Sequence, residues 1–466
     1  LDGSEGDWMM YEPFYWSKGI NDYLNNKKYA CYSSYPEDEM PPVPEATVLT
    51  LDAIKETQGG WLGERKIMSG KPTLMESYTT DKAYSVCKVD VSGYRRVRFP
   101  SVPGTGLIGS VFVDAAGNIL KSIVVPTIGL KFEAGMYLIA DVPERATALH
   151  FSILNTAEFD CVVLSHSGKI EDMEPDWVAN EEHLCAVVGS SEVGSKLRSC
   201  ITGGSTAGGM SWTDFHFYSQ QRGMQQIDAL MHSRIANLFF ARYGRRNSQE
   251  ECGAGYHSHM RTTGGTAEHG MEDTIGYDAA HAIDPNVTNA MVEDLVHQYA
   301  WYRSRDEYGQ ESVTRVNNIC CLGYEDIYGH KYDMMDGVDV PNDSGNVGKW
   351  RIWMPDGTVR MVPGKGSSGQ WTAGVAHGRY MDVVPVGTLS GSSSTYYGDV
   401  YWFSGAALRV VYRGYSSAYA YGGVSNAYAS SDASSTGAHV GSRLAFRGKI
   451  VRAQSVAAYK AIREVA

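Results

Sequence analysis

Apolar and polar residues alternate in short runs over much of the region between residues 46 and 170. Such alternation, interrupted by turn-forming sequences such as Ala116-Gly117-Asn118, is typical of strands with one buried face. The runs predict strands at Tyr84–Val91, Tyr94–Phe99, Leu107–Val113, Ile119–Pro126, Met136–Ile139, Ala148–Leu154 and Cys161–Leu164. Their short and even spacing predicts an antiparallel β-sandwich domain over residues 46–170.

The periodicity changes after Ile170–Asn180, an acidic stretch with a proline that we interpret as a domain boundary. Helical spacing of apolar residues predicts helices at Met224–Ala241, Asn286–Trp301 and Ser455–Glu464. Gly244 is a plausible stop signal for the first of these helices. Alternating runs on both sides of Pro355-Asp356-Gly357 predict a hairpin over Trp350–Met361. Helices followed by many short strands predict an α+β domain over residues 171–466.

The first 45 residues form a third region, which is rich in aromatic side chains and ends in a cluster of prolines. Trp8, Tyr11, Phe14, Tyr15 and Trp16 lie close together in it. Large apolar groups at this density need a surface to cover. We interpret residues 1–45 as an arm and linker that packs on another domain or on a neighbouring subunit.

The overall charge bears on possible partners. The chain has 466 residues and a formal net charge of −12, which disfavours nucleic acid or an anionic membrane as a partner. No apolar run approaches the roughly 20 residues needed to span a bilayer. No secretory signal is visible, but the sequence starts at Leu1, so this observation excludes no leader.

Eight cysteines are scattered along the chain without C-x-x-C spacing: Cys31, Cys87, Cys161, Cys185, Cys200, Cys252, Cys320 and Cys321. This density does not indicate a disulfide framework or a zinc site. Buried free thiols, made in a reducing cytoplasm, are expected.

Oxygen-bearing side chains gather on one Gly-containing segment, where a calcium ion could be coordinated: Asp336, Asp339, Asn342, Asp343 and Asn346. The segment lacks the EF-hand register, and the same residues also suit an ordinary turn. His257, His259, His269 and His281 match no familiar zinc spacing. Because no nucleophile elbow or phosphate-binding loop is found either, we predict no enzymatic activity.

The most unusual composition belongs to residues 412–440, YRGYSSAYAYGGVSNAYASSDASSTGAHV. Twenty-two of these 29 residues are Ser, Ala, Tyr or Gly, and five are tyrosines. Tyr and Ser dominate antibody paratopes, because Tyr supplies a large amphipathic contact area and Ser supplies adaptable hydrogen bonds. A solvated low-complexity loop is the alternative, but such tracts are usually poor in aromatic residues. The stretch therefore predicts a binding surface.

Three segments carry a resemblance to a known family. Tyr324–Asp336 resembles the D-x-x-G-N-V-W-E-W signature of C-type lectin folds of the formylglycine-generating-enzyme type, through Asp326, Gly329, Tyr332 and Asp333. His330, Lys331 and Met334 depart from that signature. Arg409–Gly414 and Gly441–Arg447 resemble the two closing signatures of the same domain. We call these three stretches the signature segments.

The closing signatures flank residues 412–440, where the variable proteins of diversity-generating retroelements carry their variable region. Asn317–Tyr324 and Gly441–Ile450 are similar to the variable tail-fibre proteins of gut-bacterial phages. The resemblance implies adenine-directed mutagenesis of AAC codons, which cannot produce Lys, Glu, Gln, Met or Trp. Residues 412–440 contain none of these five types.

By position, the resemblance implies twelve diversified contact residues: Tyr415, Ser416, Ser417, Tyr419, Tyr421, Asn426, Tyr428, Ser430, Ser431, Ser435, Gly437 and His439. The implied constant scaffold is Ala418, Ala420, Gly422, Gly423, Ala427, Ala429 and Ala433. Formylglycine-generating enzymes use a cysteine pair near the C-terminal end of this domain to bind copper. No cysteine follows Cys321 here, so that activity is not expected.

Together these observations predict a C-type lectin domain preceded by a β-sandwich and an aromatic arm. The expected function is that of a phage tail-fibre adhesin on the virion, which binds a protein or glycan receptor on the host-cell surface. Homotrimers would strengthen weak single sites through avidity. Two alternatives are a variable protein displayed on a bacterial surface and a carbohydrate-active enzyme with its site in the sandwich domain.

Overall fold

The computed structural model of the chain is built mostly from β-strands in several antiparallel sheets, with few helices among the parts of the chain that it describes. It describes residues 7–22, 24–25, 27–43, 45–58, 61–64, 74–77, 84–100, 110–123, 137–154, 161–199, 208–252, 298–305, 308, 311–329, 331–364, 369–386, 391–405, 407–415, 421–437, 439–453, 455 and 457–458. The β-rich character agrees with the alternation found in the sequence.

The chain forms two compact units. The C-terminal unit contains Leu1–Tyr15, Asn180–Ala376 and Asp382–Ala466. The sandwich unit contains Trp16–Ala179 and His377–Met381. The predicted arm, residues 1–45, is therefore divided between the two units.

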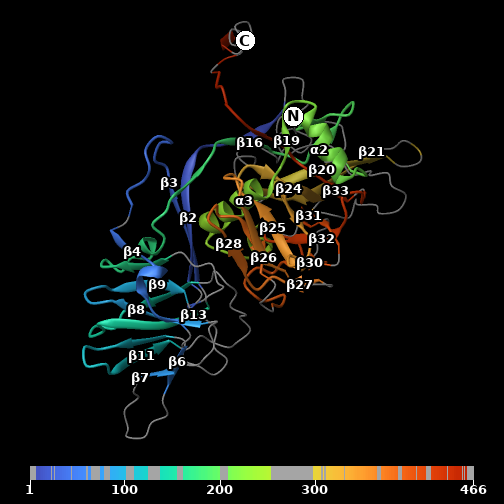
Figure 1. The fold of residues 1–466 in the computed structure, drawn as a ribbon. Coiled ribbons are helices and arrows are strands. Elements are labelled where there is room, and N and C mark those ends of the chain that lie inside the picture. Colours follow the sequence, from blue (N-terminus) through green and yellow to red (C-terminus); the bar gives the residue numbers. More distant parts are fainter. Residues whose placement is uncertain are drawn as a thin grey trace. The chain divides into compact units, whose positions relative to one another are not determined.

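Two antiparallel sheets build the sandwich unit (Figure 1). The first sheet has the order β11 (Ile119–Ile123), β10 (Ser110–Val113), β13 (Ala148–Leu154), β8 (Tyr84–Asp90) and β5 (Lys55–Gln58). The second has the order β12 (Tyr137–Asp141), β9 (Arg96–Pro100), β14 (Cys161–Ser165) and β4 (Ala46–Thr50). Seven of these strands overlap the seven strands predicted from alternation, which confirms that prediction for the residues described.

The two sheets share one hydrophobic core. Phe99 of the second sheet contacts Phe151 of the first, with ring centroids 5.3 Å apart, and both side chains are fully buried. Each buried ring of this kind contributes about 1.5–3 kcal/mol relative to an exposed one. The unit also contains a small sheet of β15 (Val178–Asn180), β2 (Tyr15–Asp22) and β3 (Lys27–Ser33), and a hairpin of β6 (Trp61–Glu64) and β7 (Leu74–Ser77).

An eight-stranded sheet organises the C-terminal unit (Figure 1). Its order is β26 (Val359–Pro363), β25 (Lys349–Trp353), β24 (Tyr332–Val340), β31 (Arg409–Arg413), β32 (Ala427–Ser431), β30 (Val400–Phe403) and β27 (Gln370–Trp371), with β33 (Val440–Gly441) paired to β24. The predicted hairpin over Trp350–Met361 is confirmed, because β25 and β26 pair across the turn at Pro355–Gly357.

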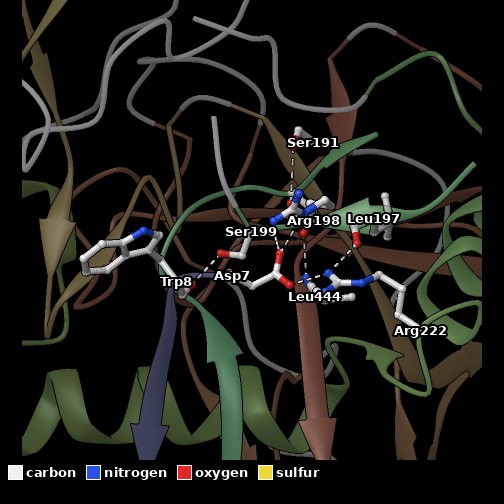
Figure 2. Close-up of polar contacts among 9 residues, drawn as sticks. Asp7, Trp8, Ser191, Leu197, Arg198, Ser199, Arg222 and Leu444 are labelled. Carbon is white, nitrogen blue, oxygen red and sulfur yellow. Dashed lines mark hydrogen bonds and ion pairs between the residues drawn. The ribbon is translucent and has the colours of Figure 1, made fainter. Parts of the chain in front are cut away.

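A second sheet of the same unit has the order β1 (Met9–Glu12), β16 (His183–Ala186), β34 (Leu444–Arg447) and β19 (Gln225–Gln226). The beginning of the described chain is tied into this unit by polar contacts (Figure 2). The Asp7 carboxylate accepts a hydrogen bond from the Ser199 amide at 2.7 Å and forms an ion pair with Arg222. The Ser199 hydroxyl donates to the Trp8 carbonyl at 2.5 Å. Met9–Glu12 thus pair into a sheet of this unit, and Asp7 and Trp8 are held beside it by hydrogen bonds.

The clearest predicted helix is present as α3 (Ala229–Tyr243). It starts later than expected, because Asp228 caps it by accepting from the Leu230 and Met231 amides, both at 2.9 Å. Gly244 ends it in a left-handed conformation (φ 63°), as predicted. Two shorter helices, α2 (Trp212–Gln220) and α4 (Ser248–Cys252), were not expected from the apolar spacing.

The helix predicted at Asn286–Trp301 is wrong where the structure describes it. Gln298–Arg305 is strand β20, paired over its whole length with β21 (Glu311–Asn318). Its first residues, Gln298 to Tyr302, are rich in aromatic residues, which favour strands. The strand pairing with β21 therefore forms although the spacing of apolar residues is also compatible with a helix. Residues 286–297 lie outside the described residues, as does most of the helix predicted at Ser455–Glu464.

The remaining described elements are short. Strand pairs join β17 (Ser191–Glu192) to β18 (Leu197–Arg198), β22 (Cys320–Cys321) to β23 (Tyr324–Glu325), and β28 (Val375–His377) to β29 (Val383–Pro385). Single helical turns occur at α1 (Leu51–Ile54) and η1 (Ile170–Met173).

Candidate functional site

Residues 412–440 contribute to three strands of the eight-stranded sheet. The stretch leaves β31, enters β32 and reaches β33, so both of its ends are held by hydrogen-bonded strands. Strand β32 also pairs with β30 in parallel, with Trp402 opposite Tyr428. The sheet thereby places side chains of the stretch beside those of β30.

Rings from several of these strands meet in one aromatic cluster: Tyr332, Trp371, Trp402, Tyr412, Tyr415, Tyr421, Tyr428 and His439. Tyr332 and Tyr412 are 5% and 2% exposed and form its buried base. Tyr428 stacks on Tyr412, with centroids 5.6 Å apart and ring planes 11° apart, and contacts Tyr332 at 5.3 Å. Burial raises the pKa of Tyr332 and of Tyr412, so both phenols stay neutral at physiological pH.

The outer part of the cluster reaches solvent. Tyr415 stacks on Trp402 with centroids 5.1 Å apart and planes 11° apart. Tyr421 meets Trp371 edge-on at 5.5 Å and Tyr415 at 6.0 Å, and it remains 40% exposed. Mutual stacking and edge-to-face contacts hold these rings in place with little rotamer freedom. The arrangement can present a preorganised amphipathic surface to a partner.

Two glycines fix the stems of the loop between β31 and β32. Gly414 has φ 88°, and a Cβ there would lie 2.5 Å from the Ile327 carbonyl oxygen. Its own carbonyl accepts from the Gly329 amide at 3.0 Å. At the other stem, a Cβ on Gly423 would overlap the Asp399 carboxylate. Only glycine fits at either place.

Buried polar groups complete the anchoring of the loop. Arg413 donates to the carbonyls of Val383 at 3.0 Å and Val424 at 3.2 Å. Asp399 is fully buried and accepts from the Ser425 amide at 2.8 Å. Burial raises the pKa of Asp399 well above its usual range, and burial lowers the pKa of Arg413 to about 10. These contacts make the loop stems part of the core.

Asn426 requires a correction, because it was predicted to be an exposed contact residue. Its side chain is fully buried. The Nδ2 group donates to the carbonyls of Val400 and Tyr421, the latter at 3.0 Å. A buried side chain that links the Tyr421 carbonyl of the loop to the Val400 carbonyl of β30 stabilises the loop and cannot touch a partner.

The other predicted contacts divide into two groups. Tyr415, Tyr428, Ser430, Ser431, Ser435, Gly437 and His439 are half-buried, and Tyr421 is exposed. Ser416, Ser417 and Tyr419 lie outside the described residues. In the predicted scaffold, Gly422, Gly423, Ala427 and Ala429 are buried and Ala433 is half-buried, whereas Ala418 and Ala420 lie outside the described residues.

His439 sits at the edge of the cluster, with its ring centroid 6.2 Å from that of Tyr332. Burial and the charge of Lys331 both lower the pKa of His439. Burial also lowers the pKa of Lys331 itself, to about 7. His439 therefore contributes a neutral ring to this edge at physiological pH.

Trp371, Trp402 and Tyr332 were not identified as site residues from the sequence. Each lies outside residues 412–440 and reaches the cluster only because its strand is a neighbour in the sheet. A local signal was present at Trp402, in the aromatic strand Val400-Tyr401-Trp402-Phe403. Tyr and Trp are the residue types that most often dominate binding energy in interfaces.

The calcium candidates have other partners in the structure. Arg351 donates to both oxygens of Asp339, at 2.8 and 2.5 Å, and lies 3.6 Å from Asp343. Asp336 pairs with His216 at 3.1 Å, and Asn346 donates to Asp343 at 2.5 Å. Within the described ranges, no group of three or more His, Cys, Asp or Glu side chains could hold a metal ion.

The signature segments lie together in the C-terminal unit. Arg443 donates its Nε to Asp333 at 2.7 Å, and Asp333 is also opposite Arg413 in the β24–β31 register. The Asp326 carboxylate accepts from the Ile319 amide at 3.1 Å. Of the residues that match the signature, Tyr332 belongs to the base of the aromatic cluster, and Asp333 and Asp326 bind neighbouring segments of the same unit.

A scan against protein-family models finds no match, and a search of curated proteins finds no relative of the chain. None of the helices in the described part of the chain is long and apolar enough to cross a membrane.

Proposed function

We propose that the chain is a receptor-binding adhesin of phage tail-fibre type, whose aromatic cluster binds a ligand on the host-cell surface. The observation that carries this proposal is the outer cluster, where Trp402 supports Tyr415 and Tyr421 stands beside it, 40% exposed. Rings that are held in place before binding lose little entropy when a partner arrives. Binding is non-covalent and depends on ring faces and small polar groups.

The separation between scaffold and surface supports diversification of this face. Ala427 and Ala429 are fully buried in β32, while Tyr428 between them and Ser430 after them are half-buried. Because strand side chains alternate between faces, the identities on the outer face can change while the inner face stays constant. The loop stems are held by hydrogen bonds from the Gly329 amide to the Gly414 carbonyl and from the Ser425 amide to Asp399, which do not involve exposed side chains.

The proposed fold is a C-type lectin domain of the formylglycine-generating-enzyme type. The adjacency of the signature segments supports it, through the Asp333–Arg443 ion pair and the Gly329–Gly414 hydrogen bond. A retroelement would alter the exposed residues of 412–440, and Trp371 and Trp402 would remain constant, because they lie outside that stretch. Homotrimers displayed repeatedly on a virion would raise the avidity of weak single sites.

Binding of the fluorescently labelled full chain to intact cells from a panel of gut-bacterial isolates tests the proposal. We expect a subset of isolates to bind, and Tyr421→Ser to lower that binding at least tenfold. Tyr35→Ser is the matched control, because Tyr35 is also 40% exposed but lies in the sandwich unit. Equal loss of binding in both variants, or unchanged binding by Tyr421→Ser, would contradict the proposal that the aromatic cluster is the binding surface.

The same assay distinguishes the class of receptor. Protease treatment of the cells removes a protein ligand, whereas periodate oxidation removes a glycan ligand. A reverse-transcriptase gene near the coding sequence, with a template copy that differs only at adenines, would support diversification. Template differences at other bases would argue against it.

A further inference from the structure

An exposed arginine of the C-terminal unit lies across two neighbouring tyrosines. Arg246 lies between α3 and α4, and its guanidinium carbon is 5.1 Å from the ring centroid of Tyr396 and 5.8 Å from that of Tyr397. Tyr397 is 4% exposed, whereas Tyr396 is 59% exposed. A guanidinium that rests on aromatic faces is held in one orientation and keeps N–H donors for a further partner. We call Arg246 and Tyr396 the arginine–tyrosine pair.

The charge of this arginine is not neutralised within the part of the chain that the structure describes, where no carboxylate forms an ion pair with Arg246. Its neighbour Arg245 differs, because it pairs with Glu250 at 3.5 Å and with Glu251 at 3.2 Å. Arg246 therefore places a local positive charge on a chain whose net charge is −12. An anionic group of a partner would complement it.

The turn that presents Tyr396 is closed by its own hydrogen bonds. The Thr395 hydroxyl accepts from the Ser392 amide at 2.8 Å, and the Gly398 amide donates to the Thr395 carbonyl at 3.3 Å. Tyr396 has φ 39°, a left-handed conformation that is rare for a bulky residue. Backbone strain of this kind gathers at functional sites. Because a strained and exposed ring adds little to the core, we expect it to contact a partner.

The arginine–tyrosine pair lies beside the loop that carries Tyr421. The Gln249 side chain donates to the Gly422 carbonyl in that loop. A Cβ on Gly398, in the turn of the pair, would lie 2.7 Å from the Asn247 side chain. The start of α4 and the residue before it thus contact both the turn and the loop, so neighbouring units of one ligand can reach both.

We propose that the arginine–tyrosine pair binds a carboxylate-bearing sugar unit of a surface glycan, next to the units that the aromatic cluster binds. This inference rests on the proposed function and names the class of ligand for the same site. A guanidinium forms two parallel hydrogen bonds with a carboxylate, a geometry that lysine cannot reproduce. The apolar face of a sugar ring packs on the exposed tyrosine, while the carboxylate of the same unit reaches the arginine.

An acidic sugar fits this place better than an acidic peptide or a neutral sugar. An acidic peptide side chain supplies the carboxylate but no rigid ring to cover Tyr396. A neutral sugar covers the tyrosine and leaves the charge of Arg246 without a partner. Both residues lie outside residues 412–440, so diversification of that stretch leaves them unchanged. The acidic unit is then common to the ligands, and the variable tyrosines select among its neighbours.

The test measures binding of the full chain to immobilised oligosaccharides that contain glucuronate, galacturonate or N-acetylneuraminate, and to their carboxyl-reduced counterparts. We expect at least one carboxylated oligosaccharide to bind at least tenfold more tightly than its reduced counterpart, and added salt to weaken this binding. Arg246→Gln should abolish the preference, and Arg246→Lys should restore only part of it. Arg145→Gln removes the same charge at an exposed position of the sandwich unit and should keep the preference.

Tyr396→Gly distinguishes a role in binding from a role in folding. Glycine adopts a positive φ without strain, so we expect the variant to keep its melting temperature while it binds the carboxylated oligosaccharide at least tenfold more weakly. A lower melting temperature with unchanged binding would overturn the role of the tyrosine.

Equal binding to the carboxylated and reduced forms, binding to none of them, or tighter binding to polyglutamate would overturn the proposal. The assay on intact cells distinguishes this failure from failure of the proposed function. If Tyr421→Ser lowers binding to cells and Arg246→Gln does not, the aromatic cluster remains the binding surface and the acidic-sugar site is wrong. If neither variant lowers binding to cells, both proposals are wrong.

Discussion

Arg443 donates its Nε to the Oδ2 of Asp333 across 2.7 Å, and both side chains are buried. The remaining guanidinium nitrogens donate to backbone carbonyls, among them that of Glu325 at 2.6 Å. One ion pair thus joins the first signature segment to the last, on either side of the Tyr- and Ser-rich stretch.

Replacing Asp333 by Ala leaves the Arg443 charge buried without its carboxylate. Removing one partner of a buried ion pair usually lowers stability by about 3–5 kcal/mol. We expect Asp333→Ala to lower the free energy of unfolding by this amount in a denaturant titration. Asp38→Asn, at an exposed turn position, is the control and should change it by less than about 0.5 kcal/mol. A small effect of Asp333→Ala would show that the pair does not stabilise this unit.

Asn426 and Ser430 make a matched pair for testing which positions accept diversity. Asn426→Tyr places a large ring in the core and removes the hydrogen bonds to the Val400 and Tyr421 carbonyls, so we expect a loss of about 2–4 kcal/mol. Ser430→Tyr, on the half-buried outer face of β32, should change stability by less than about 1 kcal/mol. Thermal unfolding of both variants measures this difference, and equal losses would contradict the division between scaffold and surface.

The Gly414 stem can be tested against a glycine with a similar positive φ but open surroundings. Gly414→Ala meets both a strained φ and the Ile327 carbonyl, and we expect a loss of about 2–4 kcal/mol. Gly357 has φ 80° with no atom within 4 Å of an added Cβ, so Gly357→Ala should lose only about 1 kcal/mol. Chemical denaturation distinguishes these values. Similar losses would mean that the close approach to Ile327 is not limiting.

Acid should destabilise the C-terminal unit through two buried histidines, His183 and His232. Burial, together with Arg234 and Arg447, lowers the pKa of His183 to about 3, and burial also lowers the pKa of His232 well below its usual value. Both imidazoles stay neutral in the folded state, whereas in the unfolded chain they take up protons below about pH 6.5. Stability is therefore full above pH 6.5 and falls as the pH drops towards the folded-state pKa.

The expected slope is about 1.4 kcal/mol per pH unit for each histidine. Denaturant titrations at pH 7.5, 6.5, 5.5 and 4.5 measure it. His183→Gln should reduce the slope, while replacing His166, an exposed histidine of the sandwich unit, should leave it unchanged. A flat profile for the wild-type chain would contradict the assignment.

Trp402 should matter for binding although it lies outside the variable stretch. Trp402→Ala removes the ring on which Tyr415 stacks, so we expect binding to receptor-bearing cells to fall at least tenfold, about 1.4 kcal/mol. Trp353→Ala is the control, because Trp353 is 42% exposed on another strand of the same sheet. Equal binding by both variants would place the ligand elsewhere.

Local pattern was sufficient for much of the sandwich unit. Alternation predicted its strands, because residues on a strand with one buried face differ at every second position wherever that strand lies. The hairpin at Pro355–Gly357 and the helix end at Gly244 could also be predicted from local sequence, because turn and cap conformations depend on a few neighbouring residues. Helix α2 also had a local signal, the Ser211–Asp214 capping box, which the apolar spacing did not reveal.

By itself, the sequence determined that residues 412–440 are small, polar and rich in Tyr, and that strands dominate the region before them. Only the tertiary structure decided that Asn426 is core, that Gln298–Arg305 is a strand, and that Trp371 and Trp402 join the tyrosines. The physical reason is that burial and ring contacts depend on which strands become neighbours. In this unit the strand order in the sheet is β31, β32, β30, which differs from their order in the chain. No single stretch of sequence specifies that order.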